Sequence, residues 1–184
     1  ELNRWEGLLA AATYPLGPST TPEVLLEAMA DEATRRLDDT DWSRLDALGV
    51  SRYEVLTIAS LVEREAGTDD ERDEIASVIY NRLAVPMRLQ IDATVIYALG
   101  FNPGRVTADD LRIASPWNTY RIDGLPPTPI GTPSVASINA AADPADTPYL
   151  FYVLGFEDGS HRFAESYEGH QANIERARAD GILP

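Results

Sequence analysis

The chain has 184 residues, of which 44% are hydrophobic and 24% charged, so it can bury the core of one domain or of one domain with a subdomain. Its net charge of -15 argues against nucleic-acid binding, which needs a basic face, and against docking on anionic lipid. No run of about 18 apolar residues is present, so no segment of the sequence is expected to span a membrane. The chain begins with Glu1 rather than Met, so we expect a processed fragment, and any anchor would lie upstream of it.

Two residue types are missing, Cys and Lys, since all 15 basic residues are Arg. Their absence excludes thiol nucleophiles, thiolate metal sites, Schiff-base chemistry and a phosphate-loop lysine. With 2 His, the chain cannot build a multi-histidine metal site. We therefore expect no metal and no cofactor, and a chemistry that rests on carboxylates, hydroxyls, amides and imidazoles.

The first half of the chain is predicted to be a strap followed by helices. Residues 1–20 end in a run of turn formers, Pro15 to Pro18, and are expected to be extended. Thr21 and Pro22 resemble an N-cap and a first helical position. The next helix is predicted from Arg52 to Glu65, with Gly67 as its C-terminal cap.

Two more helices follow. One opens at Thr68, where Glu71 three residues later completes a capping box. A short helix over Ala93–Leu99 is predicted to have Asp92 as its N-cap and Gly100 as its end.

The second half begins with a proline-rich stretch, 115–133, that predicts a long, stiff loop. A helix is expected from Thr132-Pro133 through Ala142. Aromatic-rich runs at 149–154 and 161–164 predict a β-hairpin, and a last helix covers about 166–179. The sum is an α+β fold, mostly helical with a small antiparallel sheet. We expect residues 1–50 to form the strap and an accessory helix, and 51–184 the functional domain.

The end of the Arg52–Glu65 helix carries two carboxylates, Glu63 and Glu65. On an ideal helix Glu65 projects about 60° from the middle of the apolar stripe, and Glu63 about 100° away on the other flank. Glu65 is therefore the more desolvated, and desolvation and the last helical turn both raise a carboxyl pKa, as a general acid requires. The alternative is a structural Glu65 at the boundary, paired with Arg64 or another Arg.

Two polar clusters are candidates for sugar binding. Gln90, Asp92 and Thr94 alternate, so on extended backbone they would point the same way and meet sugar hydroxyls and acetamido groups. Asp92 can serve as a helix cap as well. The loop after Pro116 adds an indole, an amide, a hydroxyl and a phenol, from Trp117, Asn118, Thr119 and Tyr120, although the Trp and Tyr can equally anchor the core.

The two histidines receive different interpretations. His161 lies on a predicted strand and is either a ligand contact or a histidine whose partners are satisfied. His170 falls at helical spacing with Tyr167, Ile174 and Ala177, and we interpret it as structural.

From Leu56 to Asn173 the sequence resembles the endolytic murein transglycosylase family, also called YceG-like. The blocks that carry the resemblance occur in the family's order, and Trp5-Glu6-Gly7 is similar to the family's strap. They are Ala59–Glu65, Asn81–Leu83, Met87–Tyr97, Ser115–Tyr120, Ile122–Ile130, Tyr149–Val153 and His161–Phe163.

The resemblance implies that Glu65 is catalytic and that the substrate is the peptidoglycan glycan strand. The implied reaction cleaves the β-1,4 bond between N-acetylmuramic acid and N-acetylglucosamine and leaves 1,6-anhydro ends. Glu65 alone suffices, because the muramic C6 hydroxyl is the nucleophile. The residues expected to hold the glycan are Gln90, Asp92, Thr94, Asn118, Thr119, Tyr120 and His161.

The resemblance also implies an upstream anchor in the cytoplasmic membrane, with the catalytic domain on the extracytoplasmic side. Peptidoglycan strands are the expected partner, the cell-wall synthesis machinery is a further candidate partner, and no nucleic acid is expected. Two alternatives stay open. One is a muramidase-type hydrolase that uses Glu65 and Asp92 and leaves reducing ends. The other is a non-catalytic peptidoglycan-binding module in which Glu65 is structural.

Overall fold

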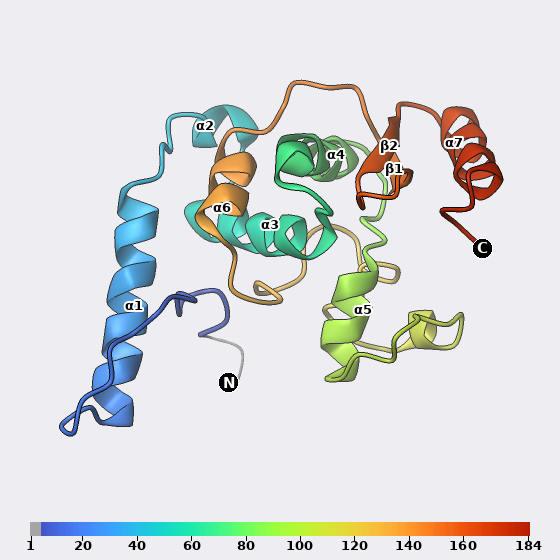
Figure 1. The fold of residues 1–184 in the computed structure, drawn as a ribbon. Helices are drawn as coiled ribbons and strands as arrows, with labels where there is room; N and C mark the ends of the chain where they lie inside the picture. Colours follow the sequence, from blue (N-terminus) through green and yellow to red (C-terminus); the bar gives the residue numbers. More distant parts are fainter. Residues whose placement is uncertain (1–4) are drawn as a thin grey trace.

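The computed structural model of the chain describes residues 5–184. Within these residues the fold is α+β and mostly helical, as the sequence predicts (Figure 1). The helices are α1 (Pro22–Asp38), α2 (Leu45–Leu48), α3 (Arg52–Glu65), α4 (Arg72–Ala84), α5 (Asp92–Leu99), α6 (Val135–Ala142) and α7 (Tyr167–Ala179). Two strands, β1 (Phe151–Leu154) and β2 (His161–Ala164), and two single 3₁₀ turns, Asp69–Glu71 and Asp110–Arg112, complete it.

Helix α3 is the centre of the core. Its N-cap is Ser51, whose hydroxyl accepts from the Glu54 amide at 3.3 Å while the Glu54 carboxylate accepts from the Ser51 amide at 2.7 Å, which closes a capping box. All residues from Val55 to Val62 are buried, so apolar burial on nearly every side holds the helix in place. Helices α4 and α6 pack against it (Figure 1). Its C-terminal end, where Glu65 emerges, is therefore fixed.

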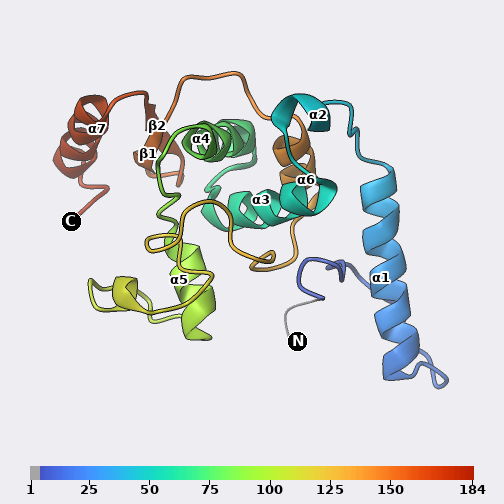
Figure 2. The same cartoon turned by 180° about the vertical axis from the view of Figure 1, so that it is seen from behind.

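The remaining elements flank this core. Helix α1 lies to one side of it, and the hairpin with α7 to the other, in both views (Figures 1 and 2). Residues 5–20 contain no helix or strand, in agreement with the predicted strap, whose residues 1–4 lie outside the described part of the chain. The strap is tied to the core by hydrogen bonds from the Tyr97 phenol to Glu6 at 3.0 Å and from the Thr132 hydroxyl to the Leu9 carbonyl at 2.9 Å.

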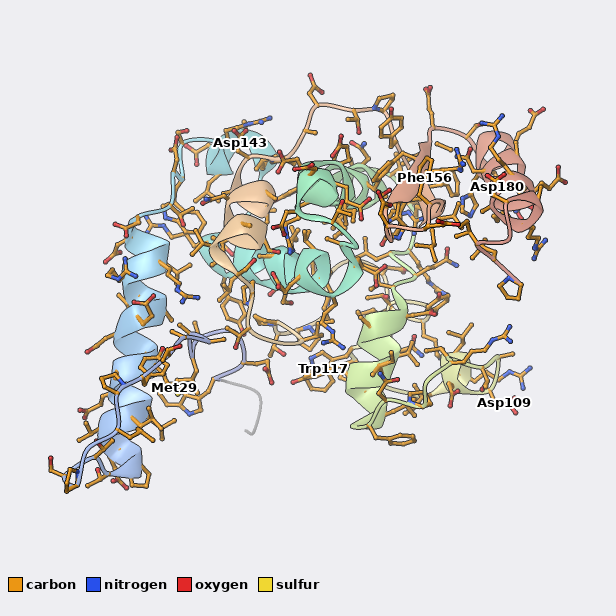
Figure 3. All side chains as sticks on the ribbon, viewed as in Figure 1. Met29, Asp109, Trp117, Asp143, Phe156 and Asp180 are labelled. Carbon is orange, nitrogen blue, oxygen red and sulfur yellow. The ribbon has the colours of Figure 1, made fainter. Side chains whose placement is uncertain are left out.

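The long loop predicted at 115–133 is confirmed, since no helix or strand lies between the Asp110–Arg112 turn and α6. Trp117, labelled in Figure 3, anchors it. Its indole N–H donates to the Thr128 hydroxyl at 2.9 Å, and its ring lies 5.7 Å from that of Tyr97. At the far end of the core, Arg44 pairs with Asp143, which joins the start of α2 to the end of α6. Among the helices of residues 5–184, none combines the length and the apolar character that a membrane span requires.

Most helix boundaries agree with the sequence, and three details need correction. α3, the Thr68–Glu71 capping box, the hairpin and α7 are confirmed. α6 starts later than expected, because its N-cap is Ser134 rather than Thr132. The Ser134 hydroxyl accepts from the Ser137 amide. Asp92 is the first residue of α5 and makes no capping hydrogen bond, since Ile91 is the N-cap. The division of the chain at residue 50 remains a prediction.

The third correction concerns Gly67, which is not a C-terminal cap. The cap of α3 is Ala66, in an extended conformation. A Cβ on Gly67 would lie 1.9 Å from the carbonyl oxygen of Gly159, in the hairpin turn. Glycine is needed here because two backbones touch, and that contact holds the hairpin against the end of α3.

The hairpin is fixed by a buried carboxylate as well. Glu71 accepts hydrogen bonds from the Gly67 amide at 2.8 Å and from the His161 amide at 2.8 Å, so it joins the end of α3 to β2. In the antiparallel register Tyr152 of β1 is opposite Phe163. This arrangement brings the side chain of Tyr152 to the last residue of α3.

Candidate active site

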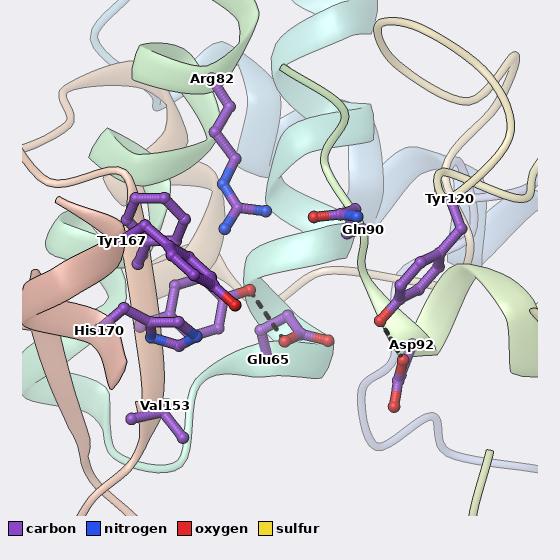
Figure 4. A pocket seen from close by; sticks show the side chains of 10 residues that line it. Glu65, Arg82, Gln90, Asp92, Tyr120, Val153, Tyr167 and His170 are labelled. Carbon is purple, nitrogen blue, oxygen red and sulfur yellow. Dashed lines mark hydrogen bonds between the residues drawn. The ribbon is translucent and has the colours of Figure 1, made fainter. Parts of the chain in front are cut away.

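A cavity of about 470 Å³ opens where the end of α3 meets the hairpin, α7 and the segment before α5. Figure 4 shows that its side chains come from elements far apart in the sequence. The residues that line it are Glu65, Arg82, Gln90, Asp92, Tyr120, Phe151, Tyr152, Val153, Tyr167 and His170. No group of three or more His, Cys, Asp or Glu side chains in the described chain is arranged to hold a metal ion.

Glu65 lies in this cavity as the last residue of α3. Its Oε2 accepts a hydrogen bond from the Tyr152 phenol at 2.9 Å (Figure 4). Burial raises the pKa of Glu65 above its usual value, and the charge of Asp92 adds to this, while the Tyr152 hydrogen bond and the nearby His161 offset part of the rise. Glu65 has no ion pair among the described residues, and Arg64 is exposed. The structure therefore does not show the alternative in which Glu65 is paired with Arg64 or another Arg.

Glu63 has the opposite environment. Its Oε2 accepts from the Ser134 and Ser137 hydroxyls at 2.6 and 2.7 Å and pairs with Arg72 at 3.3 Å. Burial alone would raise the pKa of Glu63, but these hydrogen bonds and the Arg72 charge hold it below its usual value. Glu63 is thus a satisfied anion that ties α3 to α6, and Glu65 is the carboxyl inclined to carry a proton.

Tyr152 is the donor in its hydrogen bond with Glu65. Burial raises its pKa well above the usual value, and the Glu65 charge and the hydrogen bond raise it further, so the phenol keeps its proton. Sequence reasoning included Tyr152 in a matched block but gave it no role.

Asp92 and Tyr120 lie on the opposite wall of the cavity. The Tyr120 phenol donates to Asp92 Oδ1 at 2.6 Å (Figure 4). Gln90 lines the same wall, but the predicted extended strip is wrong. Gln90 has a φ of 52°, in the left-handed region that non-glycine residues rarely adopt, and α5 begins at Asp92. Strained backbone of this kind recurs at functional sites.

Three of the predicted glycan contacts are interior residues instead. Thr94, Asn118 and Thr119 are each 0% exposed, so their side chains do not reach the cavity surface. The Thr94 and Thr119 hydroxyls are 2.9 Å apart, and the Thr119 hydroxyl accepts from the Ile91 amide at 2.9 Å. Asn118 donates to two backbone carbonyls of its own loop. These bonds hold the loop beside α5, which places Tyr120 next to Asp92.

His161 lies behind the cavity wall. Its Nδ1 is 2.8 Å from Glu71 Oε1, and its ring meets the Tyr152 ring edge-on at 5.2 Å. Of the two interpretations drawn from the sequence, the structure matches the histidine with satisfied partners, which supports Tyr152 from behind.

His170, by contrast, lines the cavity, a position that the sequence did not indicate, and its structural interpretation stays a prediction. Its ring stacks on Phe151 at 5.2 Å, and its buried Nδ1 has no hydrogen-bond partner within the described chain. Burial lowers the pKa of His170 and the charge of Arg82 lowers it further, which favours a neutral imidazole. The helical spacing around His170 is real, but it could not show that this face of α7 closes a pocket on the hairpin.

The fold and the site together define a mostly helical α+β domain with a carboxyl-centred, open, polar cavity. The chain belongs to the YceG-like family, whose model matches residues 1–176. It is 41% identical over 172 residues to an endolytic murein transglycosylase of Bacillus subtilis, a match that covers 93% of this chain and 47% of that protein. It is 34% identical over 176 residues to the endolytic murein transglycosylase of Streptococcus pneumoniae strain D39, covering 93% of this chain and 32% of that protein.

A solved structure has the same fold. The crystal structure of a YceG-like protein from Listeria monocytogenes superposes with a TM-score of 0.85 at 36% identity, over 93% of this chain and 57% of that one. The chain therefore spans about half the length, or less, of the curated relatives that it matches.

Proposed function

We propose that this chain is the catalytic part of a lytic transglycosylase that cleaves peptidoglycan glycan strands. The observation that carries the proposal is Glu65, a single carboxyl with a raised pKa that faces an open polar cavity and accepts a hydrogen bond from Tyr152. A protonated carboxyl beside a site that accepts sugar rings is the group required for acid catalysis of glycosidic cleavage. The names of the bacillary and streptococcal relatives support the same reaction.

The reaction proceeds in two proton transfers. Protonated Glu65 donates its proton to the glycosidic oxygen between N-acetylmuramic acid and N-acetylglucosamine, and the C1–O bond breaks as positive charge develops at muramic C1. The carboxylate so formed then takes the proton of the muramic C6 hydroxyl, whose oxygen bonds to C1. The products are a 1,6-anhydro-muramic end and a new N-acetylglucosamine end, and no water is consumed.

Tyr152 assists the first step, in which Glu65 gives up its proton. Its hydrogen bond costs little while Glu65 is neutral and stabilises Glu65 once the carboxylate forms. On the opposite wall Gln90, Asp92 and Tyr120 offer an amide, a carboxylate and a phenol to the sugar hydroxyls and acetamido groups.

A muramidase-type hydrolase is the second candidate, because Asp92 lines the same cavity as Glu65. Its second carboxylate would act on water or on the sugar. The relatives' names, both endolytic murein transglycosylases, favour the first candidate.

The place of action follows from the substrate. Peptidoglycan lies outside the cytoplasmic membrane, so the cavity would act on the extracytoplasmic side, with an anchor supplied by sequence upstream of residue 1. The cell-wall synthesis machinery is the proposed protein partner, because that machinery makes the strands that this reaction cuts.

The test is a digestion of purified peptidoglycan, with mass spectrometry of the new glycan ends. Wild-type chain is expected to form anhydro-muramic ends, and Glu65→Gln to form none. Glu157→Gln is the matched control, because Glu157 is exposed in the hairpin turn, and it is expected to act like the wild type. Reducing ends from the wild type would establish the hydrolase instead, and binding without cleavage would establish a binding module.

A further inference from the structure

Arg82, on α4, is a cation in the cavity that the proposed chemistry does not use. Its guanidinium points into the space beside Glu65 and Gln90 (Figure 4). Its Nε donates to the Leu150 carbonyl at 2.6 Å and its Nη1 to the Leu89 carbonyl at 2.5 Å. The guanidinium is also 5.5 Å from the centre of the Phe151 ring, which is within range of a cation–π contact.

These contacts fix the guanidinium with neutral groups and leave one edge open. Nη2 has no hydrogen-bond partner among residues 5–184, and it is not shut off from solvent. Burial lowers the pKa of Arg82, yet a guanidinium stays charged in proteins. The cavity therefore holds a rigidly placed positive charge with free N–H groups.

Within the described chain Arg82 has no carboxylate within ion-pair distance, whereas Arg72 at the other end of α4 pairs with both Glu63 and Asp69. The charge of Glu65 would raise the pKa of Arg82, but burial favours the neutral form of Glu65, which then supplies no counter-ion. The chain has 30 acidic residues and a net charge of -15, so carboxylates that could pair with an arginine are abundant. An arginine without such a partner is therefore informative. A partly buried charge without a counter-ion costs free energy, so such groups are concentrated where a ligand supplies the missing charge.

We infer that Arg82 binds a carboxylate of the substrate, carried by the lactyl group of muramic acid or by the peptide attached to it. This inference rests on the proposed function. N-acetylmuramic acid is the unit of the strand that brings carboxylates, whereas N-acetylglucosamine is neutral. A carboxylate on Nη2 would form a charge-assisted hydrogen bond and would set the muramic unit, rather than its neighbour, beside Glu65. Arg82 is then a specificity-determining residue.

The overall charge of the chain separates carboxylate recognition by Arg82 from general electrostatics. A net charge of -15 repels an anionic strand, so neutralising the strand would improve binding if no local cation recognised it. If Arg82 recognises a carboxylate, neutralising the strand weakens binding instead.

The experiment compares native soluble glycan strands with strands whose carboxyl groups have been converted to methylamides. The wild type is expected to lose roughly ten- to a hundredfold in kcat/KM on the amidated strands, mainly through KM, which is the range of one charge-assisted hydrogen bond. On native strands, Arg82→Gln is expected to lose a similar factor in kcat/KM relative to the wild type. On amidated strands, the variant and the wild type are expected to have the same kcat/KM. Arg112→Gln is the control, because Arg112 pairs with Asp109 on the exposed surface and should keep the wild-type ratio.

Equal wild-type activity on both strands would overturn the inference, and this comparison needs no variant at Arg82. The same factor lost by Arg82→Gln on both strands would also overturn it, since Arg82 would then act on the fold or on Glu65. Binding of the two strands to Glu65→Gln separates the inference from the proposed function. Weaker binding of amidated strands supports Arg82 recognition even if no anhydro ends form, and equal binding refutes it.

Discussion

The phenol of Tyr152 donates a hydrogen bond to Oε2 of Glu65 across 2.9 Å, which joins β1 to the last residue of α3. Two influences on the Glu65 proton oppose each other at this contact. Burial favours the neutral acid, and the hydrogen bond favours the carboxylate. The cavity thus favours the protonated acid that the first step uses, and the phenol stabilises the carboxylate that this step leaves.

Replacing Tyr152 by Phe is expected to raise the pKa of Glu65 further, because the hydrogen bond that lowers it is lost. The first step uses protonated Glu65, so the alkaline limb of the pH profile of kcat/KM should move to higher pH. Tyr149→Phe is the control, since Tyr149 stacks on Phe163 and makes no contact with Glu65. An alkaline limb that does not move in Tyr152→Phe would show that this hydrogen bond does not set the Glu65 proton.

Replacing Asp92 by Asn is expected to move the same limb in the opposite direction. The negative charge of Asp92 raises the pKa of Glu65, so its removal should lower that pKa and bring the limb to lower pH. Anhydro-muramic ends should persist at a reduced rate, because the new amide can still turn its oxygen toward the Tyr120 phenol but accepts a weaker hydrogen bond than the carboxylate does. Complete loss of cleavage with a folded protein would favour the hydrolase that uses both carboxyls.

The helices and the position of Glu65 follow from local patterns. The bounds of α3 are encoded by its apolar periodicity, and the angle between Glu65 and the apolar stripe shows that this carboxyl lies at the edge of the core. The hairpin is encoded by two aromatic-rich runs around the Glu157-Asp158-Gly159 turn. These features depend on neighbours along the chain, which a single sequence contains.

The rest of the site depends on contacts between distant segments. Arg82, Tyr152 and His170 line the cavity of Glu65 from α4, β1 and α7, and no local pattern encodes that meeting. The left-handed backbone of Gln90 broke the predicted strip, since an extended conformation was the reasonable expectation for a non-glycine residue there. Thr94 was misjudged for a similar reason, because polar residues in a motif can be buried hydrogen-bonding partners as well as ligand contacts.

The contact between Gly67 and Gly159 yields a prediction on how the hairpin is positioned. A Cβ on Gly67 would lie 1.9 Å from the Gly159 carbonyl oxygen, so Gly67→Ala must push the hairpin away from α3. We expect a loss of about 1–3 kcal/mol in unfolding free energy, typical of overpacking, and a fall in kcat as Tyr152 leaves Glu65. Gly131→Ala is the matched control, since a Cβ there meets nothing within 4 Å. Chemical denaturation and kinetics of the two variants test this, and equal stability would refute the close contact.

Glu65 itself should cost stability at neutral pH. Burial raises its pKa in the folded protein above the value in the unfolded chain. Between the two pKa values the folded state holds more protons than the unfolded state, so stability falls as pH rises through that window. Below the unfolded value Glu65 is protonated in both states and the penalty is absent. Glu65→Gln removes the ionisation and keeps an oxygen that can accept from Tyr152.

Glu65→Gln is therefore expected to be more stable than the wild type at pH 7, by about 0.5–2 kcal/mol, the size of gain that a single stabilising substitution commonly gives. The difference should vanish as the pH is lowered below the usual Glu value. Thermal unfolding across this pH range measures it, with Glu157→Gln as a control that shows no such trend because its carboxyl is exposed. The opposite result is a stability difference, Glu65→Gln minus wild type, that becomes more negative as the pH rises to 7. It would mean that the folded protein favours the ionised form of Glu65. The carboxyl would then lack the proton that the first step of the reaction requires.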